Sequence, residues 1–221
     1  MNASNNLGIK NLILVPALIT LAVTLLRVTG ELLNWSPFLF NKAAGGGGAL
    51  IGIAWLVPIF GFYFARQLLK ANDYPAGTGR VFGFSFLALA VSAALFAVGF
   101  RFLITSMWLA PVILMATVAG ILIARKGWSA LSTALLAYGL SARIPVALLM
   151  LFAIMGNWGT HYDVPPPNFP ADVGPFAKWV QIGLIPQLTI WMAFTVIIGS
   201  IFGGIALAMT KRSPALAKAV P

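Results

Sequence analysis

Six long apolar segments joined by short connections make up most of this chain. A helix that crosses the hydrocarbon core of a bilayer needs about 20 mainly apolar residues, and it satisfies its own backbone hydrogen bonds. The pattern therefore predicts an all-α fold: a polytopic integral membrane protein built as a bundle of about six transmembrane helices. The expected helices cover residues 11–33, 49–69, 82–102, 107–124, 129–156 and 181–209.

The composition excludes a water-soluble domain of this size. Charged residues make up 8% of the chain and apolar residues 60%, whereas soluble domains carry about 25% charged residues. We therefore expect a single transmembrane domain over residues 1–221. The first segment is too long for the apolar part of a cleavable signal peptide, so we expect it to remain as a helix.

The inventory of reactive side chains is small. The chain has no cysteine, one histidine and four acidic residues, which excludes disulfides, thiolate nucleophiles, cysteine-bound clusters and bis-histidine haem. No nucleophile–base pair can be named, so we expect no catalytic residues, no metal site, no cofactor and no enzyme activity. Basic and aromatic residues do not interleave on a polar segment, which argues against nucleic-acid binding.

The positive charge instead indicates topology, because cytoplasmic loops of membrane proteins are enriched in Lys and Arg. With the N-terminus inside, nine basic residues fall on the cytoplasmic side and three on the opposite side. The first set is Lys10, Arg66, Lys70, Arg80, Arg125, Lys126, Lys211, Arg212 and Lys218, and the second is Lys42, Arg101 and Lys178. We expect both termini in the cytoplasm and the chain in the cell (inner) membrane.

Proline shapes both the helices and the longest polar loop. The loop 157–178 contains three consecutive prolines, which favour extended backbone, and we expect it to lie outside and to cover the bundle or contact a partner. Its His161 and Asp163 supply too few ligands for a metal site, so we expect a solvated histidine there. Five further prolines are expected to kink helices. They are Pro16, Pro58, Pro111, Pro145 and Pro186.

Arginines inside the apolar segments are the best pointers to function, because ionisable residues in a membrane are usually functional. Arg27 and Arg143 lie within the first and fifth segments, and Arg101 lies at the outer end of the third. Glu31 follows Arg27 by four residues, which places both on one helix face. All three arginines are expected in the outer leaflet.

Arg143 has a polar neighbourhood of its own in the sequence. Pro145 frees the carbonyl of Ser141 one turn earlier, and that carbonyl, with Tyr138 nearby, can hold a guanidinium. The arginines, Glu31, Tyr138 and Ser141 then form an outward-facing pocket for an anionic or carboxylate-bearing ligand. The alternative is that the arginines snorkel to lipid phosphates. The pocket predicts that Arg143→Ala lowers ligand binding more than Arg66→Ala.

Small residues recur at helix-packing spacing in two segments. Gly199 and Gly203 form a G-x-x-x-G pair with Gly204 beside them, and Ala90, Ala94 and Ala97 share one face of the third segment. Such faces let helices approach closely, either within the chain or against another subunit. The glycine run 45–48 lacks the context of a phosphate-binding loop and is interpreted as a flexible turn.

Two functions fit these features. The first is transport of a small solute, for which the arginine pocket favours an anion, or the role of membrane substrate-binding subunit of a transporter. Autonomous proton coupling is not expected, because no acid lies at the bilayer midplane. The second is a non-catalytic accessory subunit of a larger membrane complex. The expected partners are the lipid bilayer and other membrane subunits, which would contact the Gly199/Gly203 face or the loop 157–178.

Overall fold

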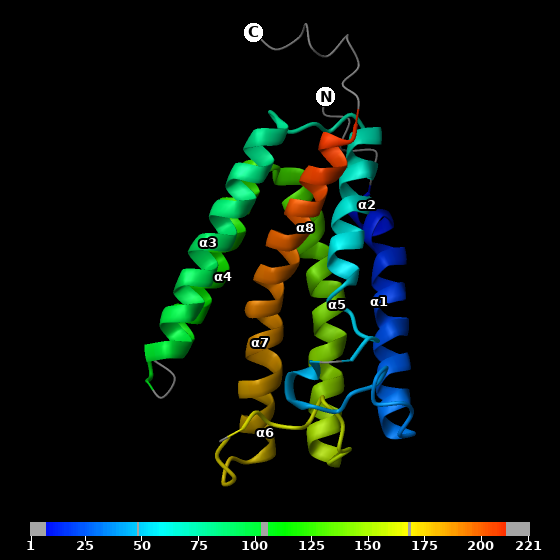
Figure 1. The fold of residues 1–221 in the computed structure, drawn as a ribbon, viewed down its shortest axis with the longest axis vertical. Coiled ribbons are helices and arrows are strands. Elements are labelled where there is room, and N and C mark those ends of the chain that lie inside the picture. Colours follow the sequence, from blue (N-terminus) through cyan, green and yellow to red (C-terminus); the bar gives the residue numbers. More distant parts are fainter. Residues whose placement is uncertain (1–7, 48, 103–105, 168, 211–221) are drawn as a thin grey trace, which may run out of the picture.

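The structure is a computed structural model that describes residues 8–47, 49–102, 106–167 and 169–210. Within these ranges it contains helices and no strand, which confirms the all-α class (Figure 1). Five helical stretches are long and apolar enough to cross a membrane. They are α1 (Ile9–Leu32), α3 (Thr78–Phe102), α4 (Leu109–Gly127), α5 (Ser129–Gly156) and the stretch Pro175–Ala208.

The second apolar segment is a shorter helix than the sequence predicts. The helix α2 covers Leu56–Lys70, or 15 residues, instead of 49–69. At about 1.5 Å per residue it spans about 22 Å, less than the roughly 30 Å core of a bilayer. Residues 36–47 and 49–55 before it, called here the irregular segment 36–55, form turns, bends and the short 3-10 helix η2 (Ala44–Gly46). This irregular segment folds back on itself through backbone hydrogen bonds from Leu50 to Phe38 and from Ile51 to Leu39.

The last spanning stretch is not one regular helix, although a single helix over 181–209 was predicted. It consists of α6 (Pro175–Lys178), the π-helix η3 (Trp179–Leu184), α7 (Ile185–Leu188) and α8 (Ile190–Ala208). At Thr189 the backbone leaves helical geometry, with φ −120° and ψ −83°. π-Helical turns occur frequently at functional sites.

Pro16 and Pro145 lie inside α1 and α5, and Pro186 lies where the π-helix continues into α7 with helical backbone on both sides. The expectation of a kink is wrong for Pro58 and Pro111, which lie in the first turns of α2 and α4. A proline in the first turn removes no helical hydrogen bond, because the N–H groups there have no partner within the helix.

α8 lies at the centre of the bundle and packs against α2, α3, α4 and α5, while α1 packs against α5 and α2. Glycine permits the closest of these contacts. A Cβ atom on Gly61 of α2 would lie 2.4 Å from the carbonyl oxygen of Gly199 in α8, so a side chain at Gly61 forces these two helices apart. A Cβ atom on Gly199 would instead lie 2.3 Å from the Leu135 side chain of α5. Gly199, Gly203 and Gly204 thus pack inside the chain, and the first two are buried against α2 and α5, not presented to another subunit.

The alanine face of α3 is exposed, unlike the buried glycines of α8. Ala90, Ala94 and Ala97 are exposed. The residues of α3 that are buried within the chain are Val81, Ser85, Ala88, Ser92 and Gly99. The alanines therefore take no part in the packing of this chain.

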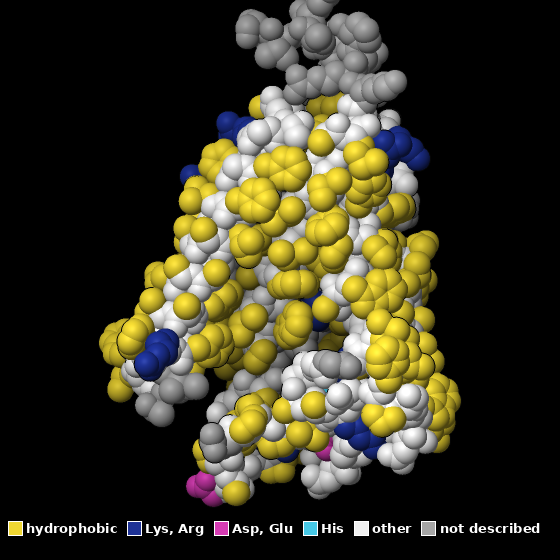
Figure 2. Space-filling view, viewed as in Figure 1, with side chains coloured by type: hydrophobic (Ala, Val, Ile, Leu, Met, Phe, Trp, Pro, Cys, Tyr) yellow, Lys and Arg dark blue, Asp and Glu magenta, His cyan; other side chains and the backbone are white. Residues whose placement is uncertain are grey.

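Apolar side chains form a broad band on the surface, with most basic side chains near its two ends (Figure 2). The α3–α4 hairpin follows α8 at one end of the molecule and diverges from the other helices at the opposite end (Figure 1). At that opposite end lie the irregular segment 36–55 and the loop that connects α5 to α6.

Candidate functional site

A cavity of about 730 Å³ lies at the end of the molecule where the α3–α4 hairpin diverges. Its wall comes from α1, α3, α5, the π-helix region, the irregular segment 36–55 and the loop after α5. Figure 2 shows a hollow in this part of the surface, with basic atoms visible inside it. The polar side chains in the wall are Thr24, Arg27, Arg143, His161, Tyr162, Gln181 and Gln187.

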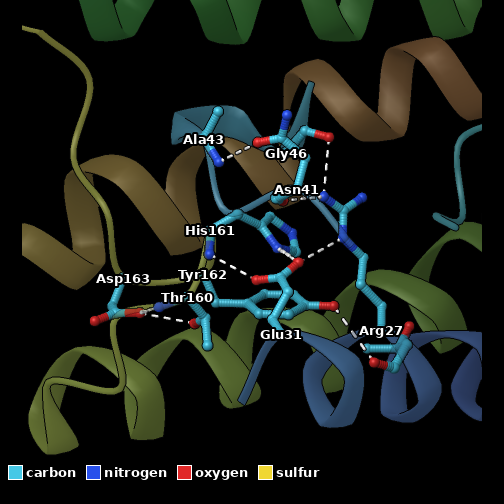
Figure 3. Close-up of polar contacts among 10 residues, drawn as sticks. Arg27, Glu31, Asn41, Ala43, Gly46, Thr160, His161, Tyr162 and Asp163 are labelled. Atoms are coloured by element: carbon cyan, nitrogen blue, oxygen red, sulfur yellow. Dashed lines mark hydrogen bonds and ion pairs between the residues drawn. The ribbon is translucent and has the colours of Figure 1, made fainter. Parts of the chain in front are cut away.

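Arg27 makes three hydrogen bonds within the protein, as Figure 3 shows. Its Nε donates to Oε1 of Glu31 at 2.8 Å, and its Nη2 donates to the carbonyl oxygens of Asn41 and Gly46 at 3.1 and 3.0 Å. The predicted pairing within α1 is therefore present. Arg27 also attaches the irregular segment to α1, because the carbonyls of Asn41 and Gly46 belong to that segment.

Glu31 is completely buried and also binds the loop after α5. The backbone N–H of His161 donates to Oε2 of Glu31 at 2.8 Å, and the imidazole Nδ1 lies 2.5 Å from Oε1 (Figure 3). The sequence interpretation of His161 as a solvated residue is wrong, since its side chain is 13% exposed. The Arg27–Glu31 pair thus joins α1 to two other parts of the chain: Arg27 bonds the irregular segment, and Glu31 bonds the loop after α5.

The neutral form of His161 fits this arrangement. Burial lowers the pKa of the imidazole below its usual value, although the hydrogen bond to Glu31 opposes the shift. A neutral imidazole with its proton on Nδ1 donates to the carboxylate and leaves Nε2 as an acceptor. Gly46 leaves room for this ring, since a Cβ there would lie 2.7 Å from Cδ2 of His161. The residue also has a φ of +70°, which favours glycine.

Asp163 does not pair with His161 as a metal ligand. Its carboxylate accepts hydrogen bonds from the backbone N–H groups of Gly159 and Thr160 and from the Thr160 hydroxyl, at 2.7–2.9 Å. It lies on the far side of the loop from Arg27 (Figure 3). No group of three or more potential metal ligands occurs among the described residues.

Arg143 differs from Arg27 because the protein provides no counter-ion for it among the described residues. It is 3% exposed, and its Nε is buried without a hydrogen-bond partner. Its guanidinium lies over the ring of Trp191, 4.8 Å from the ring centre. Because an arginine stays charged in a protein, the cavity wall contains one positive charge that the neighbouring side chains do not neutralise. At this burial Arg143 does not extend to a lipid phosphate.

A second buried polar group lines the same cavity. Gln187 of α7 is 8% exposed, and its Oε1 has no hydrogen-bond partner among the described residues. Its Nε2 contacts only the sulfur of Met150, at 3.8 Å. The π-helix and the break at Thr189 flank α7. The unsatisfied acceptor of Gln187 and the unneutralised guanidinium of Arg143 thus line the same cavity. Neither Pro186 nor Gln187 was assigned to the site from the sequence.

Three residues of the predicted pocket lie elsewhere. Tyr138 is in the hydrophobic core, where its hydroxyl contacts Thr20 at 2.8 Å and its ring packs on Phe60. Ser141 donates to the carbonyl of Ala137. Arg101 is exposed, with its guanidinium over the ring of Phe102. None of these three lines the cavity, whereas Arg27 and Arg143 do.

The arrangement offers a buried guanidinium, an amide oxygen and an apolar wall, which together suit the binding of a ligand. No protein-family model matches the chain, and no curated protein or solved structure matches it.

Proposed function

We propose that the chain binds an anion in this cavity, either to transport it across the cell membrane or to present it to a transporter as the membrane substrate-binding subunit. The buried, unneutralised guanidinium of Arg143 carries this proposal. A charge in a low-dielectric site is destabilising unless it is paired. An anionic ligand provides the missing partner, and Gln187 gives the site an acceptor for a ligand hydroxyl or N–H.

The proposed topology places the cavity in the outer half of the bilayer, with both termini in the cytoplasm. The nine-to-three distribution of basic residues supports this orientation. In the same topology, α2 together with the irregular segment before it accounts for the sixth crossing. The loop after α5 then closes the outer end of the cavity through His161.

Thermal unfolding of the purified protein tests the proposal with a panel of anions. Acetate, octanoate, inorganic phosphate and dodecyl phosphate are compared with choline chloride, because a ligand that binds the native state raises Tm. We expect a saturable increase in wild type and in Arg66→Ala, and no increase in Arg143→Ala. Arg66 is a matched control because it is exposed and lies outside the cavity. The absence of stabilisation by every anion, or equal stabilisation of both variants, would contradict the proposal.

A second candidate function is that of an accessory subunit in a larger membrane complex. The exposed face formed by Ala90, Ala94 and Ala97 favours it, since small residues allow another helix to approach closely. Native mass spectrometry after mild detergent extraction separates the two functions. A stable larger assembly favours the accessory subunit, and a monomer that is stabilised by anions favours binding and transport.

A further inference from the structure

The cavity is larger and more apolar than a small inorganic anion requires. Its volume of about 730 Å³ lies within the range of roughly 300–1,000 Å³ that is typical of sites for drug-sized ligands. The wall around the polar groups is mainly hydrophobic. Its apolar members include Ile53, Val146, Met150, Ile182, Ile190 and Trp191. Such a wall binds a hydrocarbon group, since burial of apolar area is favourable by about 25 cal/mol per Å².

The cavity also has an open side within the apolar band of the molecule. Phe100 near the end of α3 lines the cavity and is 45% exposed, and Trp55 lines it and is 49% exposed. α3 packs against α4 and α8. At its Phe100 end it lies apart from α7 (Figure 1), and the hollow there is bordered by hydrophobic side chains (Figure 2). A chain in the outer leaflet therefore has lateral access to the cavity.

The net charge of the cavity wall limits how many negative charges the ligand headgroup can carry. Arg27 and Glu31 neutralise each other at 2.8 Å. Burial lowers the pKa of His161 and so favours its neutral form beside Glu31. Arg143 then leaves one positive charge in the wall. One negative charge on the ligand balances it, and a second would be buried without a partner.

From these observations we infer that the ligand is an amphiphile with one anionic headgroup, whose headgroup binds Arg143 and whose apolar chain extends between α3 and α7 into the bilayer. The inference rests on the proposed anion site and specifies its substrate class. A carboxylate and a phosphodiester share the required chemistry. The Oε1 atom of Gln187 favours a headgroup with a hydroxyl or N–H close to the anionic group, because that group satisfies the orphaned acceptor.

Tryptophan fluorescence in nanodiscs tests this inference, because Trp55 and Trp191 line the cavity. The full chain is reconstituted in phosphatidylcholine and titrated with stearate brominated in mid-chain, which quenches nearby indoles. We expect saturable quenching that unbrominated stearate reverses and acetate or inorganic phosphate does not. A control with brominated phosphatidylcholine gives the amount of quenching caused by the surrounding lipid.

The variant Arg143→Met is expected to weaken stearate binding roughly tenfold or more, since a charge-assisted hydrogen bond contributes about 1.5–3 kcal/mol. Arg66→Met should bind as wild type does. Gln187→Leu is a second cavity variant, and size-exclusion chromatography shows whether each variant is folded.

Each outcome has a distinct meaning. If acetate or phosphate displaces the probe as effectively as stearate, the site binds anions but the amphiphile inference is wrong. If no anion binds saturably, both the inference and the proposed function fail. If stearate binds equally well to wild type and Arg143→Met, the headgroup lies elsewhere and the inference is again overturned.

Discussion

At the scale of single residues, two buried arginines differ in how the protein compensates their charge. Arg27 donates to three acceptors, one of which is the carboxylate of Glu31. Arg143 has only the face of Trp191 and no counter-ion among the described residues. Arg27 holds the irregular segment to α1, and we expect the uncompensated charge of Arg143 to lower the stability of the fold. Sites that sacrifice stability in this way are characteristic of binding function.

Substitution distinguishes the two arginine environments without a ligand. Arg143→Met should leave Tm unchanged or raise it, because replacement of a buried charge by an apolar side chain is neutral or stabilising by about 1–4 kcal/mol. Glu31→Gln should lower the free energy of unfolding by about 3 kcal/mol, since it leaves Arg27 buried without a counter-ion. Thermal unfolding of the delipidated protein measures both. A lower Tm for Arg143→Met would mean that its charge has a structural partner.

Sequence reasoning identified Arg27, Glu31 and Arg143 because an ionisable residue in an apolar segment is conspicuous. It missed the role of His161, whose partner Glu31 lies 130 positions away. No local pattern encodes such a contact. Gln187 had a usable signal, as a polar residue next to a proline in an apolar segment. Tyr138 was misplaced because its helix face turns toward the core, where Thr20 satisfies its hydroxyl.

At the scale of elements, the loop after α5 is held by hydrogen bonds of His161 and Asp163. His161 docks the loop on Glu31, and Asp163 organises the preceding turn. Because burial lowers the pKa of His161 in the folded protein, the unfolded or undocked state binds a proton more readily. The stabilisation of the docked loop is therefore present when the pH is above the pKa of histidine in the unfolded chain, about 6.5. It is lost as the pH falls through the lower pKa that His161 has in the folded protein.

Hydrogen exchange checks this pH dependence. We expect the amide protection factors of residues 157–164, corrected for intrinsic exchange, to fall between pH 7.5 and pH 5.0. The variant His161→Asn keeps a donor for Glu31 and does not titrate, so its protection should change less over the same interval. Equal losses in wild type and His161→Asn would mean that His161 is not the source of the pH dependence.

The helices that were predicted best are those whose ends have local signals. The fifth was expected at 129–156, and α5 covers Ser129–Gly156, where Asn157 ends it in the left-handed conformation with φ 48°. The second was extended into residues 49–55 because that stretch is apolar. Residues 49 and 52–55 line the cavity from a non-helical segment instead. Hydropathy alone does not distinguish such a segment from a helix.

At the scale of the whole molecule, the proposed orientation can be tested by labelling, because the chain contains no cysteine. Ala171 lies in the loop after α5 and Ala76 in the connection before α3, and both are exposed. In spheroplasts, a membrane-impermeant maleimide should label Ala171→Cys directly and Ala76→Cys only after permeabilisation. The reverse pattern would invert the topology and place the cavity on the cytoplasmic side.

The irregular segment before α2 has a thermodynamic consequence for binding. Non-helical backbone at membrane depth is tolerated only where it is buried in protein or faces a water-filled space, and residues 49, 52, 53, 54 and 55 face the cavity. We expect the cavity to contain water before the proposed amphiphile binds, because Arg143 and Gln187 also line it. Binding replaces that water with hydrocarbon, so the association should have a negative heat-capacity change, and its enthalpy should become more favourable as temperature rises.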